Sequence, residues 1–344
     1  MTTQQDCSIG ISIPEAAYGT STTPVSFFEF TDEGFELKRT DVQGTGLRVS
    51  APFARAARRA TAVFDVAGSI GTELFSRGMS KLFAAVTGTG TATLVSGTAF
   101  QHLFTANTTD FLPSYTIQKG IPPLGGGATL PHTFDGCVCS DLEVSAPNGG
   151  MVTVKTNWLG RKLSTATAYA APSYPASGEL LTFVGATATI GTSGVVAPTT
   201  TARGTVTTPL AVVNVTDFTF KLDNNLDGAG WRFGGGGYRT RPPAVGLRAG
   251  TGMITVEFDG AIWRDLWLNQ ANVSMVITFT GQTAISAGVF PELSICLPLV
   301  RLEGDIPNSN KGDVISQTIN YTVLDGGVAA SPFYLSYVTA DTTI

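Results

Sequence analysis

The chain has 344 residues, of which only 14% are charged, and it carries a formal net charge of −5 with a pI near 5.1. This charge argues against a protein that binds nucleic acid by neutralising phosphates, because such proteins cluster positive charge. No stretch reaches the roughly 18 consecutive apolar residues of a membrane span. The N-terminus lacks the basic start and apolar run of a signal peptide, so we expect synthesis in the cytoplasm.

The low charged fraction, beside 40 glycines, predicts much uncharged surface. Such surface usually marks partner contact. We therefore expect an obligate assembly.

Most of the chain predicts β-strands, so the expected fold class is mainly β. Short runs rich in Val, Thr, Phe and Ile are separated by Gly, Pro, Asn and Asp about every ten residues. Two segments, 68–86 and 260–276, repeat apolar residues at helical spacing instead. The side chains expected to pack these two short helices against the sheets are Ile70, Leu74, Phe75, Ile262, Leu266 and Trp267.

Two regions rich in Gly, Pro or Thr flank the strand-like stretch 137–160. The first, 91–135, predicts a long loop or flap with a hairpin of its own. The second, 161–215, predicts an extended arm with a strand within 178–190. Both regions are candidates for the segments that lock one layer of the expected assembly to the next.

The two helical segments begin two similar stretches of sequence. GSIGTELF (68–75) aligns without gaps with GAIWRDLW (260–267), which matches Gly, Ile and Leu. Each follows a strand-like run that ends in Phe-Asp and precedes a run that ends in Thr-Gly. The repeated order of strand, short helix and strand predicts an internal duplication.

Hairpin-like segments further along support the duplication. MVTVKTNW (151–158) aligns with VISQTINY (314–321), which pairs Asn157 with Asn320 and Trp158 with Tyr321, and Cys139 then falls opposite Cys296. The predicted organisation is a first unit over 1–160 with an insert at about 91–135, an arm or connector over 161–215, and a second unit over 216–344.

The motif CVC at 137–139 raises the question of a metal site. A zinc site needs further Cys or His ligands at suitable spacing, and only His132 stands nearby. Strand thiols are therefore favoured over a metal site. In a reducing compartment the four cysteines, Cys7, Cys137, Cys139 and Cys296, are expected to be free.

Other motifs have simpler interpretations than a ligand site. DNNLDG (223–228) resembles the start of a calcium loop, but Gly234 stands where a bidentate Glu is required, so a turn is favoured. The glycine runs 125–127 and 234–237 lack the Lys-Ser/Thr of a phosphate-binding loop. His102 and His132 lie in no catalytic pattern. We expect no metal, no cofactor and no enzymatic activity.

Basic residues gather at two places, and we consider two roles for them. One is contact with nucleic acid; the favoured one is intersubunit pairing with acidic residues such as Glu29, Asp32, Glu33 and Glu36, because arginine can fix register through its planar fork. The interface candidates are Arg55, Arg58, Arg59, Arg239 and Arg241.

The ordered set of motifs resembles the tail tube proteins of long, non-contractile-tailed bacteriophages. The similarity rests on IGISIPEAAYGTSTTPVSFFEF (9–30), PSYTIQKG (113–120), FTFKLDNNLD (218–227) and the repeated strand, helix and strand order. Many members have a single unit, whereas this chain is predicted to have two.

The resemblance implies a structural virion protein of the phage tail. Its subunits form rings that stack into a hollow tube, and strands of each β-sandwich or barrel unit join neighbours in an inner β-barrel through which DNA passes without specific binding. Relatives place six units in a ring, so three copies of a duplicated chain imply a pseudo-hexameric trimer. Lining strands are expected within 41–66, 140–158, 245–259 and 296–323, with polar or acidic residues inward. Other tail proteins are the expected partners at the tube ends.

Two other kinds of virion protein are alternatives. A carbohydrate-binding or adhesin-like β-sandwich would need exposed aromatic residues, and only Trp231 looks free in the sequence. A capsid decoration or tail terminator protein would form one closed ring or cap instead of a polymer.

Overall fold

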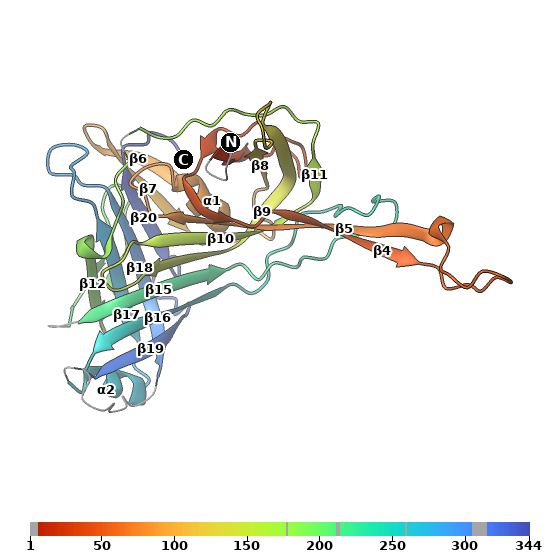
Figure 1. Ribbon diagram of the computed structural model, residues 1–344. Helices are drawn as coiled ribbons and strands as arrows, with labels where there is room; N and C mark the ends of the chain where they lie inside the picture. Colours follow the sequence, from red (N-terminus) through yellow and green to blue (C-terminus); the bar gives the residue numbers. More distant parts are fainter. Residues whose placement is uncertain (1–5, 177, 211–213, 259, 305–314) are drawn as a thin grey trace.

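The computed structural model describes residues 6–344 except 177, 211–213, 259 and 305–314 (Figure 1). The described part is mainly β, as predicted, with two α-helices. The sheets are not closed within the single chain.

In the first half the elements are β1 (Ser8–Pro14), β2 (Ser26–Phe27), β3 (Phe30–Glu33), β4 (Glu36–Gln43), a 3₁₀ turn (Ala56–Arg58), β5 (Arg59–Glu73), α1 (Ser80–Thr87), β6 (Thr91–Ser96), β7 (Ala99–Thr105), β8 (Tyr115–Ile121), β9 (Leu130–Ala146), β10 (Thr153–Gly160) and β11 (Lys162–Ser164). In the second half they are a 3₁₀ turn (Phe183–Gly185), β12 (Ala186–Gly191), β13 (Val195–Val196), β14 (Thr205–Val206), β15 (Val215–Asp223), β16 (Ala249–Glu257), α2 (Ile262–Leu268), β17 (Val273–Thr280), β18 (Glu292–Glu303), β19 (Ser316–Val323) and β20 (Tyr334–Thr339).

The first helix is shorter than predicted. Residues 68–73 belong to β5, which pairs with β10 from Val66 to Glu73, and α1 begins only at Ser80. Gly68 and Gly71 are weak helix formers, so the backbone pairing outweighs the helical spacing of the apolar residues. The helix prediction was therefore wrong for 68–79, and α1 ends at Thr87, before Gly88, whose φ of 79° is left-handed.

The second helical prediction was also too long. Helix α2 covers Ile262–Leu268, and residues 273–276 already belong to β17. The alignment of 68–75 with 260–267 places a strand on a helix and was wrong. The strand that matches β5 is β16, because β5 pairs with β10 as β16 pairs with β19.

The two halves share one order of paired strands. In the first half it is β4–β5–β10–β9, and in the second it is β15–β16–β19–β18. Trp158 stands opposite Gly68, and Tyr321 stands opposite Gly252, in agreement with the predicted match of 151–158 with 314–321. Cys139 pairs with Trp158, but the residue opposite Tyr321 in β18 is Leu302, so Cys139 and Cys296 are not equivalent.

The two sets of strands join into one continuous sheet. β9 pairs with β15 from Asp141 to Ala146, so the first-half strands run on into the second half. Figure 1 shows β10, β15, β16 and β19 lying along a common axis across the body of the molecule, and β16 is antiparallel to both β15 and β19.

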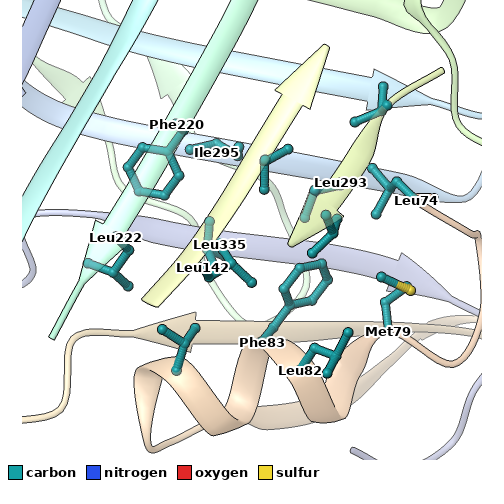
Figure 2. Packing of buried hydrophobic residues seen from close by; sticks show 14 of the residues in the cluster. Leu74, Met79, Leu82, Phe83, Leu142, Phe220, Leu222, Leu293, Ile295 and Leu335 are labelled. Carbon is teal, nitrogen blue, oxygen red and sulfur yellow. The ribbon is translucent and has the colours of Figure 1, made fainter. Parts of the chain in front are cut away.

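One face of this sheet forms the core. Phe83 and Leu82 of α1 pack near Leu142 of β9 and Leu222 of β15, beside Leu335 of β20 (Figure 2). These residues come from both halves and belong to one buried cluster. The halves therefore share a hydrophobic core as well as a sheet.

The insert 91–135 is not the long loop or flap that was predicted, because β8 and the start of β9 also lie within it and pair with each other. Within 91–135, β6 and β7 form the expected hairpin, and β7 also pairs with β20 near the end of the chain. The 161–215 segment contains β12, which pairs with β17. The predicted strand at 178–190 is therefore present, though it covers only the later part of that range.

The β4–β5 hairpin projects away from the rest of the chain (Figure 1). Its connecting residues, 44–58, present three large apolar side chains to solvent: Leu47, Val49 and Phe53 are 100%, 90% and 86% exposed. Such a group of apolar side chains on a projecting hairpin is unusual for a monomer and marks a contact surface.

Candidate assembly interface

The face of the joined sheet that points away from the core is polar. On β10, Thr153 and Lys155 are exposed and Asn157 is half-buried, while Val154, Thr156 and Trp158 are buried. Cross-strand neighbours continue this polar face with Ser145, Glu143 and Asp141 on β9, Thr219, Lys221 and Asp223 on β15, Thr251 and Thr255 on β16, and Thr318, Asn320 and Thr322 on β19. The alternation is the period of two of a strand with one buried side.

Acidic residues outnumber basic ones on the polar face of these strands. The acidic positions are Glu73, Asp141, Glu143, Asp217, Asp223 and Glu257, and the basic ones are Lys155 and Lys221. A surface of this sign repels a polyanion.

Asp141 is held in place at the middle of this face. Its carboxylate accepts hydrogen bonds from Asn157 Nδ2 (2.7 Å) and Ser140 Oγ (2.9 Å), and Lys221 Nζ lies 3.9 Å away. Asp223 of β15 stands directly opposite Asp141. The Lys221 ammonium therefore offsets the repulsion between two carboxylates at this junction.

The junction between β9 and β15 is reinforced beyond its ladder. Asn224, which follows β15, donates its backbone N–H to Ser140 O (2.8 Å). The buried Asn224 Nδ2 also donates to Val86 O at the end of α1 (2.9 Å) and to Cys139 O (3.3 Å). One side chain thus ties the second half to both a helix and a strand of the first.

The outer ends of the joined sheet lack such partners. Among the described strands, β4 pairs only with β5, whereas β15 pairs with both β16 and β9. At the other end, β17 covers β18 only as far as Val300. Exposed strand edges carry unpaired backbone groups that favour pairing with another chain.

The loop 224–248, between β15 and β16, lies against the first half. Arg239 is 2% exposed; its guanidinium donates to Asp65 Oδ1 (2.6 Å), Gly160 O (2.6 Å) and Gly228 O (2.7 Å), and it stacks over Trp231 at 4.5 Å. Trp231 Nε1 in turn donates to Phe64 O. Tyr238 stacks on Phe64 with ring centroids 4.7 Å apart.

This loop changes two expectations. Arg239 is buried inside its own chain, so it was wrongly assigned to an intersubunit interface. Trp231 is half-buried under Arg239, so it is not a free aromatic platform. Arg241 lies beside it and pairs with Asp227 (2.6 Å).

The remaining arginine candidates lie at the β4–β5 hairpin. Arg59 bonds to Asp41 at 3.1 Å, Arg58 reaches Gly46 O, and Arg55 uses its carbonyl to accept from Gln43. None of the three is buried. Their role between subunits stays a prediction.

The acidic residues suggested as partners have other contacts in this chain. Glu33 pairs with Lys119 at 3.1 Å, and Glu36 pairs with Lys38 at 2.6 Å. Among the described residues the ion-pair partners of Glu33 and Glu36 are therefore lysines and not the candidate arginines.

The helix-packing candidates fall into two groups. Ile70 and Leu74 are fully buried and Phe75 is partly buried, but all three lie in or just after β5 and not on a helix. Ile262, Leu266 and Trp267 do lie on α2; Ile262 is 40% exposed, and the other two pack partly against the core. The buried residue of α2 is Trp263.

The chemical motifs keep the simpler interpretations. Cys137 and Cys139 are free and buried in β9, and burial raises the pKa of both thiols well above its usual range. No group of metal-ligating side chains occurs among the residues that the structure describes. Asn225 has a left-handed φ of 48°, and its N–H bonds to Asp223 Oδ1 (2.8 Å), as expected for a turn at 223–228.

A sequence signal for the matching strands was overlooked. TDEGFELK (31–38) and TDFTFKLD (216–223) share Thr, Asp, Phe and Leu at the same positions, and GSIGTE (68–73) and GMITVE (252–257) share Gly, Ile and Glu. These segments are the paired strands β3–β4 with β5 and β15 with β16. Aligning these segments in the sequence identifies β4 with β5 and β15 with β16 as equivalent strand pairs.

A polar sheet face, a buried opposite face and open strand edges define a subunit of a β-sheet assembly. The model of the phage tail tube protein family matches residues 5–323, nearly the whole chain. The chain therefore belongs to the phage tail tube protein family and is a structural component of a phage tail. No curated protein matches it. None of the helices in the described parts is long and apolar enough to span a membrane.

Proposed function

We propose that three copies of this chain close a ring, and that such rings stack into the tail tube that conducts phage DNA. In this ring each copy contributes two tandem units, one within 1–160 and one within 216–344, so six four-stranded sheets form the inner barrel. Closing the barrel between chains pairs the edges that each chain leaves open. A tube subunit of this kind has a geometric and non-enzymatic role.

The observation that carries the proposal is the β9–β15 junction. It joins two sheets of the same strand order within one chain. Repetition of the same join between copies turns the sheet into a closed cylinder, since the free β4 edge and the far end of β18 are the two sides of that join. The 161–215 connector and the exposed tip of the β4–β5 hairpin are available to hold neighbouring subunits or rings.

The stoichiometry is tested by native mass spectrometry and electron microscopy of the purified protein. We expect rings of three chains with pseudo-sixfold symmetry and hollow tubes built from them. Rings of six chains would contradict the duplicated unit. Discrete single rings or caps without tubes would instead support a terminator or decoration role.

The polar face is proposed to line the DNA channel. Its acidic excess prevents the passing DNA backbone from binding to the wall. Glu143→Lys in assembled phage should slow DNA ejection severalfold, with Glu143→Gln as the control that removes charge without reversing it. Unchanged ejection for Lys at Glu143, Asp217 and Glu257 alike would refute an electrostatic lining.

A further inference from the structure

We propose that the end of β18, at Glu303, is completed by the outer edge of β4 from a second copy of this chain, in the antiparallel register that sets Glu303 opposite Lys38. The inference rests on the proposed ring and adds its seam: which strands meet and which residues face one another. It follows from the strand pairings inside one chain.

The first step places Glu303. In the first half, Asn157 of β10 stands opposite Asp141 of β9. In the second half, Asn320 of β19 stands opposite Glu303 of β18. Asn157 and Asn320 are equivalent, because the residues after them lie opposite Gly68 and Gly252. Glu303 therefore occupies the place of Asp141.

The second step places Lys38. Phe220 of β15 stands opposite Gly252, and the ring of Phe35 lies over Gly68, the equivalent glycine. Three residues further along, Asp223 and Lys38 are in matching positions. Their partners agree, because Asp223 pairs with Ala249 and Lys38 pairs with Asp65, each three residues before its glycine.

The third step transfers the register. Inside the chain Asp141 stands directly opposite Asp223. The same join between copies sets Glu303 opposite Lys38, because within the chain the ladder ends at the equivalent pair, Asp141 and Asp223. Among the described residues the ladder between β17 and β18 ends at Val300, so no strand pairs with this edge of β18 at Glu303, whose carboxylate accepts a hydrogen bond from Thr322 Oγ1 of β19 (2.9 Å).

The charges fit this register. Within the chain, Asp141 faces another carboxylate and takes its cation from Lys221, two residues before Asp223. On β4 the order is reversed, with Glu36 two residues before Lys38. Lys221 thus supplies the ammonium for Asp141 within the chain, and Lys38 supplies it for Glu303 between copies. A direct cross-strand pair of opposite charge stabilises the sheet.

The unpaired edge of β4 is limited to a short stretch. Phe35 already donates its N–H to Glu33 Oε2 (3.1 Å), and its carbonyl accepts from Lys119 Nζ (2.9 Å). The free backbone of the edge therefore begins after Phe35. Among the described residues, the ion-pair partner of Lys38 is the neighbouring Glu36. The Lys38 side chain is 70% exposed.

Disulfide trapping tests the register. Lys38→Cys with Glu303→Cys, in a Cys7→Ser background, should give chains cross-linked to one another on mild oxidation of the assembled protein. The other cysteines are buried. Directly opposite residues whose backbone groups point away from each other have Cα atoms about 4.5 Å apart, within the range that a disulfide spans.

The chain offers a matched control. Asp141→Cys with Asp223→Cys occupies the same register within one chain and should give an intrachain disulfide with no change in chain mass. Glu303→Cys with Leu37→Cys should cross-link at least tenfold less, because Leu37 points to the other face. Preferential trapping of Glu303→Cys with Glu36→Cys or Thr40→Cys would overturn the register. The proposed function would still stand if the protein formed three-chain rings.

A charge exchange provides an independent readout. Lys38→Glu should raise the protein concentration needed for assembly severalfold, and adding Glu303→Lys should restore it. Failure of the double variant to recover, with the single variant impaired, would place the Lys38 partner elsewhere. If the wild-type protein forms no three-chain rings, the proposed function itself is refuted.

Discussion

Strands β15 and β4 occupy the same place in the two halves, yet their surroundings differ. β15 has a neighbour on each side, and its end is fixed by Asn224 and by a folded loop that carries Arg239. β4 has one neighbour, and its loop presents Leu47, Val49 and Phe53 to solvent. Among the described strands the same sequence pattern thus has two strand neighbours in β15 and only one in β4.

The largest effect is expected from breaking the internal seam with proline. Asn224 N–H points to β9, so by strand alternation the N–H of Leu222 does so too. Leu222→Pro removes that bond and a buried side chain, and should destabilise the fold by more than about 3 kcal/mol. Thermal unfolding and soluble yield measure the loss.

Proline at the matching edge residue should act differently. Leu37→Pro should leave a folded chain, because edge strands tolerate proline, but it should abolish ring formation in size-exclusion chromatography. Leu37→Ala removes the same side-chain packing, keeps the N–H and should still assemble. Normal rings from Leu37→Pro would show that the β4 edge is not a seam.

A smaller effect distinguishes the two loops. Arg239→Ala leaves the partly buried Asp65 without its cation and removes two bonds to carbonyls, which should cost about 2–4 kcal/mol, below the full value for a buried pair because Asp65 is 40% exposed. Arg59→Ala removes an exposed pair with Asp41 and should lower the stability far less, because solvent screens exposed ion pairs. Chemical denaturation of the two variants compares them.

Arg239→Lys serves as the control for charge alone. Lysine keeps the positive charge but lacks the planar fork that reaches Asp65, Gly160 and Gly228 together, so only part of the stability should return. Equal losses for Arg239→Ala and Arg59→Ala would mean that loop 224–248 is no better fixed than the projecting hairpin.

The smallest effect concerns α1, which hydrogen bonds through His102 tie to Asp341 near the end of the chain. His102 Nε2 donates to Asp341 O (2.9 Å), so Nδ1 accepts from Ser80 Oγ of α1 (2.6 Å). Burial lowers the pKa of His102, so the unfolded chain takes up a proton first as pH falls below about 6.5.

Stability should therefore be complete above that pH and decline below it, by at most about 1.4 kcal/mol per pH unit. His102→Gln should remove this part of the slope in unfolding measurements between pH 7 and pH 5. A slope that the substitution leaves unchanged would assign the acid sensitivity to other groups.

Much of the fold could be predicted from the sequence because it depends on local signals. Strand alternation and turn residues gave the mainly β class, and the match of Asn157 with Asn320 gave an equivalence that the strand register agrees with. The resemblance on short motifs gave the family. The hairpin within 91–135 followed from its glycines and prolines.

The errors have a common physical cause. At 68–79 apolar spacing suggested a helix, but pairing with β10, a strand more than 80 positions away, decided the outcome. Arg239 seemed to be a surface charge because Asp65, Gly160 and Gly228 are far from it in sequence. Contacts made by distant segments leave no local pattern, whereas the overlooked match of 31–38 with 216–223 was available in the sequence.

The covalent link between the two halves has a consequence for how a ring would respond to dilution. If three chains complete a cylinder, every second boundary is closed by a single polypeptide and is independent of protein concentration. The effective local concentration of one half around the other replaces a bimolecular encounter at those boundaries. A diluted ring would then separate only at the remaining three boundaries, releasing paired units and never single ones.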